Sequence, residues 1–321
     1  MDETLRILKE SEKMEGRLFY GLAGWPTGSD ADETERYYVN LARDLSLANR
    51  KEFHQCTTKG VPLVYHCRVT VNRGHIDDAD VLTQVGIFTA QSNWVTRNAA
   101  VKTHFAREAM YKNAGVKKSE RGRYDKTLKL NFDAASQTWQ TPVFQDGAAT
   151  YDTTGSDWDP STISIDDDSS LVPCILGTIA NEESTVSADT FNIQNAYLAS
   201  RRKPQVDDLS ATEDVAVSSI LRQMFELDDE RDDEIQALTQ SVGDGTPYDS
   251  DAVAGTYTSA AYAGYGVIGN LASPMLVMDV DIPFGLMEIT ANKKTSDGAG
   301  GNVSQQLFTH IEVLGISEMQ G

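Results

Sequence analysis

The sequence has few cysteines and no long apolar run, and each absence excludes a class of protein. Three cysteines in a chain of 321 residues are too few for a disulfide framework, so a reducing compartment is the simpler expectation. No apolar run reaches the roughly 18 residues of a membrane span, because Asp279 and Asp281 interrupt the most hydrophobic stretch, residues 274–286. The start, Met1-Asp2-Glu3, lacks the basic and apolar parts of a signal segment. We therefore expect no transmembrane segment and no export by the standard secretory route.

Catalytic signatures are also missing. The chain has no Gly-x-Ser-x-Gly elbow, no His-Glu-x-x-His pair and no phosphate-binding Gly-Lys-Ser/Thr loop. Its five histidines leave few residues for general acid–base chemistry, and its acidic residues are too numerous to single out a catalytic pair. The sequence therefore predicts a protein that is not an enzyme and has no catalytic residues.

One motif matches a nucleotide-cofactor site by its letters alone. Residues 264–269 fit the Gly-x-Gly-x-x-Gly fingerprint, whose chemistry requires a strand before it and a helix after it. A strand-like stretch, residues 274–282, follows instead. We interpret these glycines as a bend in an antiparallel sheet and predict no cofactor.

Two groups of residues have the chemistry of metal ligands without the spacing. His54, Cys56, His66 and Cys67 resemble a zinc set, but neighbours such as His66 and Cys67 point to opposite faces of a strand. The acidic run at residues 227–234 lacks the alternating oxygens and the glycine of a calcium loop. We predict no metal site, and interpret these residues as a buried thiol, a surface histidine and a solvated helix face. A weak divalent-ion site between subunits is the alternative for the acidic run.

Charge is unevenly distributed along the chain. With 48 acidic and 28 basic residues, the net charge of −20 repels bulk nucleic acid and anionic membranes. Between residues 94 and 131, however, ten basic residues outnumber three acidic ones, whereas residues 207–251 hold fourteen acidic residues and two arginines. This complementarity favours pairing between subunits or within the chain, over nucleic acid, for the basic segment. The segment consists of Arg97, Lys102, Arg107, Lys112, Lys117, Lys118, Arg121, Arg123, Lys126 and Lys129.

Residues 1–60 differ from the rest in periodicity. Thr4–Met14 and a stretch from about Ser29 to Leu47 have apolar residues at helical spacing, which predicts an N-terminal helical arm or clamp. In residues 61–321, apolar stripes near 93–115 and 213–240 predict two inserted helices. Strand patterns occupy residues 63–71, 81–89, 127–132, 138–144, 161–165, 171–179, 190–198, 256–261, 264–268, 274–282, 286–290 and 307–316.

This order of elements predicts an all-β, mainly antiparallel fold with inserted helices. Strands that do not alternate with helices argue against a parallel sheet. Short strands separated by turn-forming residues favour a jelly-roll sandwich over residues 61–321. A single jelly roll fits better than a double one, which needs about sixteen strands.

Three stretches of the sequence resemble capsid proteins of small single-stranded DNA viruses and phages. They are Leu41–Lys51, Asn93–Ala99 and Leu307–Ile316. The resemblance implies a jelly-roll coat protein, made in the host cytoplasm and located in the virion. Many copies of it would form an icosahedral shell, with other virion proteins as further partners and a weak contact with the packaged nucleic acid. Such proteins often carry an N-terminal arm rich in Arg and Lys, whereas this N-terminus is mixed in charge and slightly acidic.

A carbohydrate-binding or carbohydrate-active β-sandwich is the alternative. Aromatic side chains in loops can stack on sugar rings, and they can equally fill turns and core. The candidates are Trp139, Tyr151, Trp158 and Tyr257.

Overall fold

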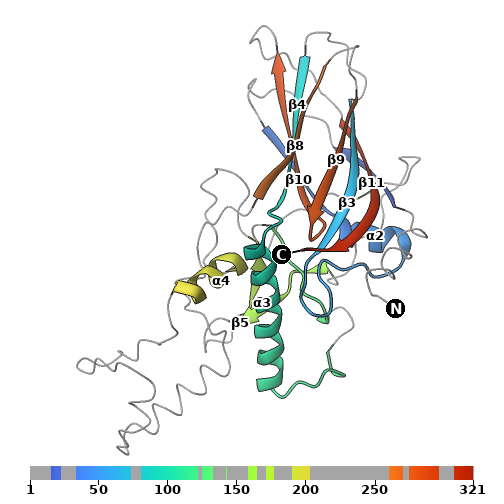
Figure 1. Ribbon diagram of the computed structural model, residues 1–321. Helices are drawn as coiled ribbons and strands as arrows, with labels where there is room; N and C mark the ends of the chain where they lie inside the picture. Colours follow the sequence, from blue (N-terminus) through green and yellow to red (C-terminus); the bar gives the residue numbers. More distant parts are fainter. Residues whose placement is uncertain are drawn as a thin grey trace, which may run out of the picture.

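The computed structural model (Figure 1) describes residues 16–22, 34–73, 81–121, 125–132, 142, 158–164, 171–176, 190–202, 260–269, 275–295 and 307–320. Most strands form one body at the top of Figure 1, and the helices α3 and α4 lie below it. The elements in chain order are β1 (Arg17–Leu22), β2 (Thr34–Asn40), α2 (Leu41–Asn49), β3 (Leu63–Arg73), β4 (Val81–Ala90), α3 (Trp94–Asn113), β5 (Thr162–Ser164), β6 (Leu171–Ile175), β7 (Phe191–Asn192), α4 (Ile193–Arg202), β8 (Ala260–Ile268), β9 (Met275–Pro283), β10 (Leu286–Thr295) and β11 (Leu307–Glu318).

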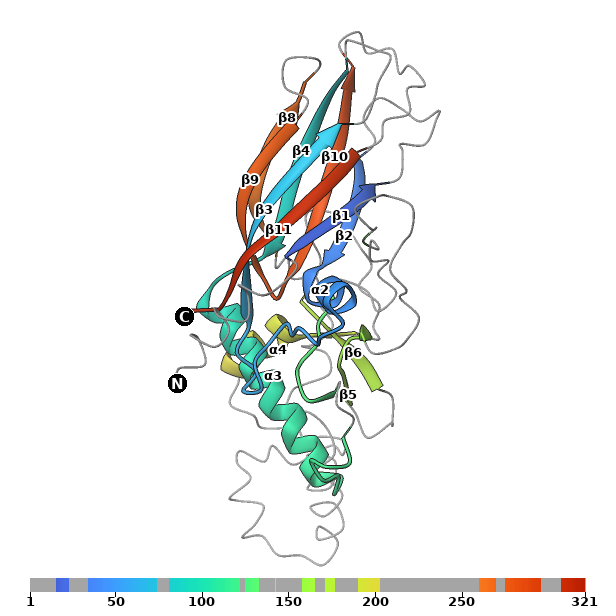
Figure 2. The ribbon, with the colours of Figure 1, turned by 90° about the vertical axis from the view of Figure 1, so that its right-hand side faces the viewer.

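Two four-stranded antiparallel sheets pack face to face. Sheet A has the strand order β1-β11-β3-β9 and lies toward the viewer in Figure 2, and sheet B has the order β2-β10-β4-β8. One apolar cluster fills the space between them, with Val69 and Ile311 from sheet A and Ile87 and Ile289 from sheet B fully buried. The prediction of an all-β, mainly antiparallel sandwich with inserted helices is confirmed.

The alternating pattern of β3 explains why it lies at the centre of sheet A. Tyr65, Cys67 and Val69 point into the core, whereas His66 and Arg68 point outward. Because successive side chains of a strand face opposite sides, one face of β3 is apolar and the other is polar. The same reasoning predicted β4, β9 and β11 within two residues of their observed bounds, and the first half of β10.

The helix α2 packs against β1 through a buried polar cluster. The Asn40 side chain accepts a hydrogen bond from the Arg43 backbone N–H at 3.2 Å and so caps the helix. The Tyr20 hydroxyl donates to Asp44 Oδ2 at 2.7 Å, and Arg43 Nε donates to Asp44 Oδ1 at 2.8 Å. Burial raises the pKa of Asp44 to about 6, although Arg43 and the Tyr20 hydrogen bond act in the opposite direction.

Two glycines of the dinucleotide-like motif, Gly264 and Gly266, lie in β8, at the edge of the sandwich. A Cβ on Gly266 would lie 2.3 Å from Cδ1 of Leu276, and one on Gly264 would lie 2.9 Å from Sδ of Met278. Both of these neighbours belong to β9, in the other sheet. The glycines therefore let the edge strands of the two sheets approach each other closely.

A second, smaller core lies below the sandwich in Figure 1, where α3, α4 and the short sheet β5-β6-β7 meet. Residues 127–132 cross this core in an extended conformation, and Gln55 ties them to the sandwich. Its side chain donates to the Leu130 carbonyl at 3.1 Å and accepts from the Leu130 N–H at 2.6 Å. Phe284 and Leu286, beside the β9–β10 turn, belong to the same cluster, so the two cores are adjacent.

The expectation of a helical arm over residues 1–60 was wrong where the structure describes them. Residues 17–22 and 34–40 are β1 and β2, one in each sheet, and only Leu41–Asn49 is helical. Tyr37 and Val39 face the core from a strand, and Leu41 and Leu45 continue that apolar surface from a helix. Across this junction of a strand and a helix, the apolar residues are therefore spaced as they would be in one longer helix.

A second correction concerns the predicted strand at residues 190–198. β7 covers only Phe191–Asn192, and α4 begins at Ile193. The Asn192 side chain accepts hydrogen bonds from the N–H groups of Gln194 and Asn195, at 3.0 and 3.1 Å, which is the action of a helix cap. The candidates Thr4–Met14 and 213–240 lie outside the described residues, as does 138–144 apart from residue 142.

Candidate interaction surfaces

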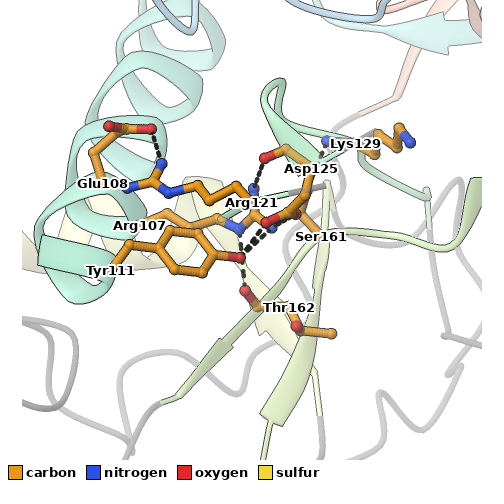
Figure 3. Close-up of polar contacts among 8 residues, drawn as sticks. All are labelled: Arg107, Glu108, Tyr111, Arg121, Asp125, Lys129, Ser161 and Thr162. Atoms are coloured by element: carbon orange, nitrogen blue, oxygen red, sulfur yellow. Dashed lines mark hydrogen bonds and ion pairs between the residues drawn. The ribbon is translucent and has the colours of Figure 1, made fainter. Parts of the chain in front are cut away.

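We name the part of the molecule that contains α3, α4 and the sheet β5-β6-β7 the helical end. The basic segment predicted from the sequence lies mostly in it. Its first four members are on α3, the next three lie in and after the turn that follows, and Lys126 and Lys129 belong to residues 125–132. Arg123 lies outside the described residues. Figure 3 shows that residues from α3, from the segment after it and from β5 lie together around Arg107 and Asp125, with β5 contributing the Thr162 carbonyl.

Arg107 is buried and holds three parts of the chain together. Its Nε donates to the Thr162 carbonyl of β5 at 3.3 Å, and its Nη2 donates to the Tyr111 hydroxyl at 3.0 Å. The same nitrogen pairs with the Asp125 carboxylate, which also accepts a hydrogen bond from Tyr111 (Figure 3). A guanidinium in such a place is a structural tie and is not available to a polyanion.

Arg121 is similarly engaged. Its guanidinium pairs with Glu108 and lies over the Tyr111 ring, with Cζ 4.1 Å from the ring centroid. The Lys118 ammonium is 3.7 Å from the other Glu108 oxygen. Arg107, Lys118 and Arg121 therefore pair with acidic side chains of the same stretch, residues 94–131, whereas the acidic block 207–251 lies outside the described residues.

Among the described members of the basic segment, the exposed ones are all lysines. Lys112, Lys117, Lys118 and Lys126 are exposed, and Lys112 and Lys118 border a hollow of about 420 Å³ at the end of α3. By contrast, Arg97 donates to the Met319 carbonyl at 3.1 Å, and the Lys129 ammonium lies 5.0 Å from the centre of the Trp158 ring. Burial lowers the pKa of Lys102. Of the described members of the segment, these four lysines are thus the ones within reach of nucleic acid or of another subunit.

The outer face of sheet A, which we name the ladder face, presents side chains in cross-strand rows. One row runs across all four strands as Arg17, Glu312, Arg68 and Asp279. Arg17 Nε lies 3.4 Å from Glu312, and Arg68 Nε donates to Asp279 at 2.8 Å. The charges along this row alternate in sign. The next rows are more apolar, and contain Phe19, His310, Thr70 and Val277, then Phe308, Asn72 and Met275.

A hydrogen-bonded triad lies at the other end of the ladder face. His66 Nδ1 is 2.6 Å from Asp281 Oδ1, and His66 Nε2 is 2.8 Å from Ser317 Oγ. The same order of groups activates a serine nucleophile in hydrolases. Here the Asp281 side chain is 68% exposed, so water weakens the field that would stabilise an imidazolium. The arrangement braces β9, β3 and β11 at the surface.

The outer face of sheet B has an aromatic patch near its edge. Tyr262 and Tyr265 of β8 are more than half exposed, and the Tyr262 ring lies edge-on to Phe88 with 5.3 Å between centroids. Val267 extends the patch along the same strand. Exposed apolar groups that gather in this way on a sheet face indicate an interaction surface.

The four residues that resemble a zinc set in the sequence do not come together. Cys67 is buried in the sandwich core and Cys56 in the second core, and burial raises the pKa of both thiols. His66 faces outward with Asp281, and His54 Nδ1 is 3.3 Å from the Thr127 hydroxyl. Within the described ranges, no three His, Cys, Asp or Glu side chains are grouped to hold a metal ion.

Comparison with known proteins gives no relative: the chain matches no family model, no curated protein and no solved structure. In the part of the chain that the structure describes, no helix is both long and apolar enough to cross a bilayer.

Proposed function

We propose that this chain is a structural protein of a virion, whose copies self-assemble into an icosahedral capsid shell. The observation that carries the proposal is the strand order of the sandwich. Successive strands alternate between sheets A and B, except for β4 and β8, and the first and last strands are neighbours. Two interlocked Greek keys produce this order in an eight-stranded jelly roll, an architecture found in viral capsid domains. One such sandwich supports a single jelly roll.

Surface chemistry supports assembly over binding of a small ligand inside the fold. Jelly rolls also occur in lectins and in cupins, so the architecture does not decide the function. In this protein the space between the sheets is filled with buried apolar side chains. Both outer faces, however, expose large apolar groups, among them Tyr262 and Tyr265 on sheet B and Val277 and Phe308 on sheet A. Exposure of this kind on two faces suits a subunit that has several neighbours.

The basic segment has a limited role in this proposal. Its buried arginines stabilise the helical end of the subunit, and its exposed lysines supply only a weak contact with the packaged genome. Copies of the chain, and other proteins of the virion, are its main partners. The protein is made in the host cytoplasm and resides in the capsid.

The test is the assembly state of the purified full-length chain. Light scattering and negative-stain electron microscopy over a range of salt concentrations should show capsomers or closed particles. A monomer of 35.2 kDa under every condition would contradict the proposal.

Carbohydrate binding remains the second candidate, but through other residues than the sequence suggested. Trp158 is only partly exposed and lies under the Lys129 ammonium, and the other three aromatic candidates lie outside the described residues. Tyr262 and Tyr265, with 6.3 Å between ring centroids, offer an exposed platform on which a sugar ring could stack. Binding on a glycan array that is lost in Tyr262→Ala would favour this function.

A further inference from the structure

We propose that the ladder face binds the ladder face of a second copy, through a two-fold axis parallel to the strands. This inference deepens the proposed function, since it names one contact by which the subunits assemble. It rests on the row Arg17, Glu312, Arg68, Asp279, whose charges run +, −, +, − across the sheet.

The symmetry of this row selects the axis. Rotation about an axis parallel to the strands, between β11 and β3, reverses the order of the row in the second copy. Arg17 then faces Asp279 of the other copy, and Glu312 faces its Arg68, so every charge meets the opposite sign. An axis along the row would place each charge on its own equivalent, which is repulsive. Only the first arrangement is electrostatically complementary.

The adjoining rows are compatible with the same axis. In the next row, Phe19 would face Val277 of the second copy, and His310 would face Thr70. The Phe19 and His310 rings are already stacked on each other, with 4.6 Å between centroids, so each ring restrains the position of the other. Val277, Met275 and Phe308 are each about half exposed, and contact with a second copy would remove this apolar surface from water.

The ordered charges are exposed enough to reach a partner. The side chains of Arg17, Arg68 and Asp279 are 64%, 46% and 63% exposed, and the described elements leave this face of sheet A uncovered in Figure 2. Four strands about 4.8 Å apart and about nine residues long cover roughly 450 Å² on each partner. That is a small interface, so we expect a weak dimer that many simultaneous contacts strengthen within a shell.

The decisive experiment is a charge swap at the two ends of the row. Arg17→Glu alone, or Asp279→Lys alone, places like charges opposite each other twice, because the two-fold repeats every contact. Each should weaken dimerisation at least tenfold in sedimentation velocity at low salt. The double variant Arg17→Glu/Asp279→Lys makes the row −, −, +, +, which is again complementary under the same rotation, and should recover dimerisation. Lys112→Glu on α3 is the control for Arg17→Glu, since it makes the same change in net charge away from the ladder face.

Cross-linking supplies a second readout that does not depend on stability. Sheets packed face to face lie about 10 Å apart, farther than a disulfide spans, so a short bis-maleimide is the suitable reagent. A mixture of Arg17→Cys and Asp279→Cys chains should give cross-linked heterodimers. Neither variant alone should react between copies, because like positions are about 14 Å apart across the sheet in addition to the gap. The native cysteines are buried, and the unsubstituted chain serves as the blank.

The outcomes separate this inference from the proposed function. If the wild-type chain assembles while the single charge variants assemble equally well, or the double variant fails to recover, the ladder-face contact is wrong and the capsid proposal stands. Cross-linking of either cysteine variant with itself as efficiently as in the mixture would also overturn it. A wild-type chain that stays monomeric refutes the capsid proposal together with this contact.

Discussion

The sandwich and the helical end use basic residues in opposite ways. On the ladder face, Arg17 and Arg68 are exposed and pair with acidic side chains on neighbouring strands. In the helical end, Arg107 and Arg121 are nearly inaccessible and hold α3 to the segments packed on it. The comparison teaches that the position of a guanidinium, and not the local density of charge, decides whether a partner can reach it.

The largest expected effect on stability comes from removing Arg107, the buried arginine that links α3 to Asp125 and β5. Arg107→Ala removes the cationic partner of Asp125, which keeps its hydrogen bond from Tyr111, and the donor to the Thr162 carbonyl, so we expect the free energy of unfolding to fall by about 2–3 kcal/mol. Arg68→Ala, on the sandwich surface, should lower stability much less, because water screens its pair with the exposed Asp279. Urea denaturation measures both, with Lys112→Ala as an exposed control on the same helix as Arg107. Equal losses for the two arginines would remove the distinction between the regions.

At the edge of the sandwich, stability depends on the close packing of β8 against β9 more than on charged side chains. Gly266→Val forces the new side chain against Leu276 and should destabilise the fold by about 1–3 kcal/mol. Gly21→Val introduces the same side chain on β1, where no atom lies within 4 Å of the new Cβ, and should be nearly neutral. The midpoints of thermal unfolding compare the two. A tolerated Gly266→Val would mean that β8 and β9 are not in close contact.

Asp44 is an exception to the contrast between exposed charges on the sandwich and buried charges in the helical end, because its carboxyl group is buried within the sandwich. Its folded-state pKa of about 6 lies above the ordinary value, so the native state binds more protons between about pH 4 and pH 6. This group's contribution to stability therefore falls as pH rises through that window, by about 1 kcal/mol between pH 4.5 and 5.5. Asp44→Asn should remove that fall in urea denaturation at the two pH values. An unchanged difference would assign the pH dependence to other groups.

The smallest effect is expected from the exposed lysines of the helical end. Alanine at Lys112, Lys117, Lys118 and Lys126 together should change stability by about 1 kcal/mol or less. With four lysines as the contact, the logarithm of the affinity for single-stranded DNA should fall with the logarithm of salt with a slope no steeper than about −3. Fluorescence anisotropy at several salt concentrations measures the slope. A much steeper slope would show that the arginines contribute after all.

Much of the fold was predictable from the sequence, because its strongest patterns reflect burial directly. The alternation of Tyr65, Cys67 and Val69 predicted β3, and the apolar stripe near residues 93–115 predicted α3. β2 was missed because Tyr37 and Val39 are followed at once by the helical Leu41 and Leu45 on the same apolar surface. The signal for α4 was the cap residue Asn192, which precedes a stretch that is otherwise equally compatible with a strand.

The candidate surfaces were less predictable, because they depend on register. The sequence shows that Arg107 lies in a basic segment, but not that Tyr111 and Asp125 meet it in the fold. Likewise Arg68, Asp279 and Glu312 occupy outward positions of three predicted strands, yet nothing local to those strands says that they lie in one row. Pairing between strands more than two hundred residues apart is a property of the whole chain.

Electron cryo-microscopy of the purified full-length chain tests the central claim most directly. The account predicts closed shells built from this sandwich, with pairs of subunits in contact across their ladder faces. A homogeneous population of single subunits, at concentrations far above those in a cell and over all salt concentrations, would contradict it.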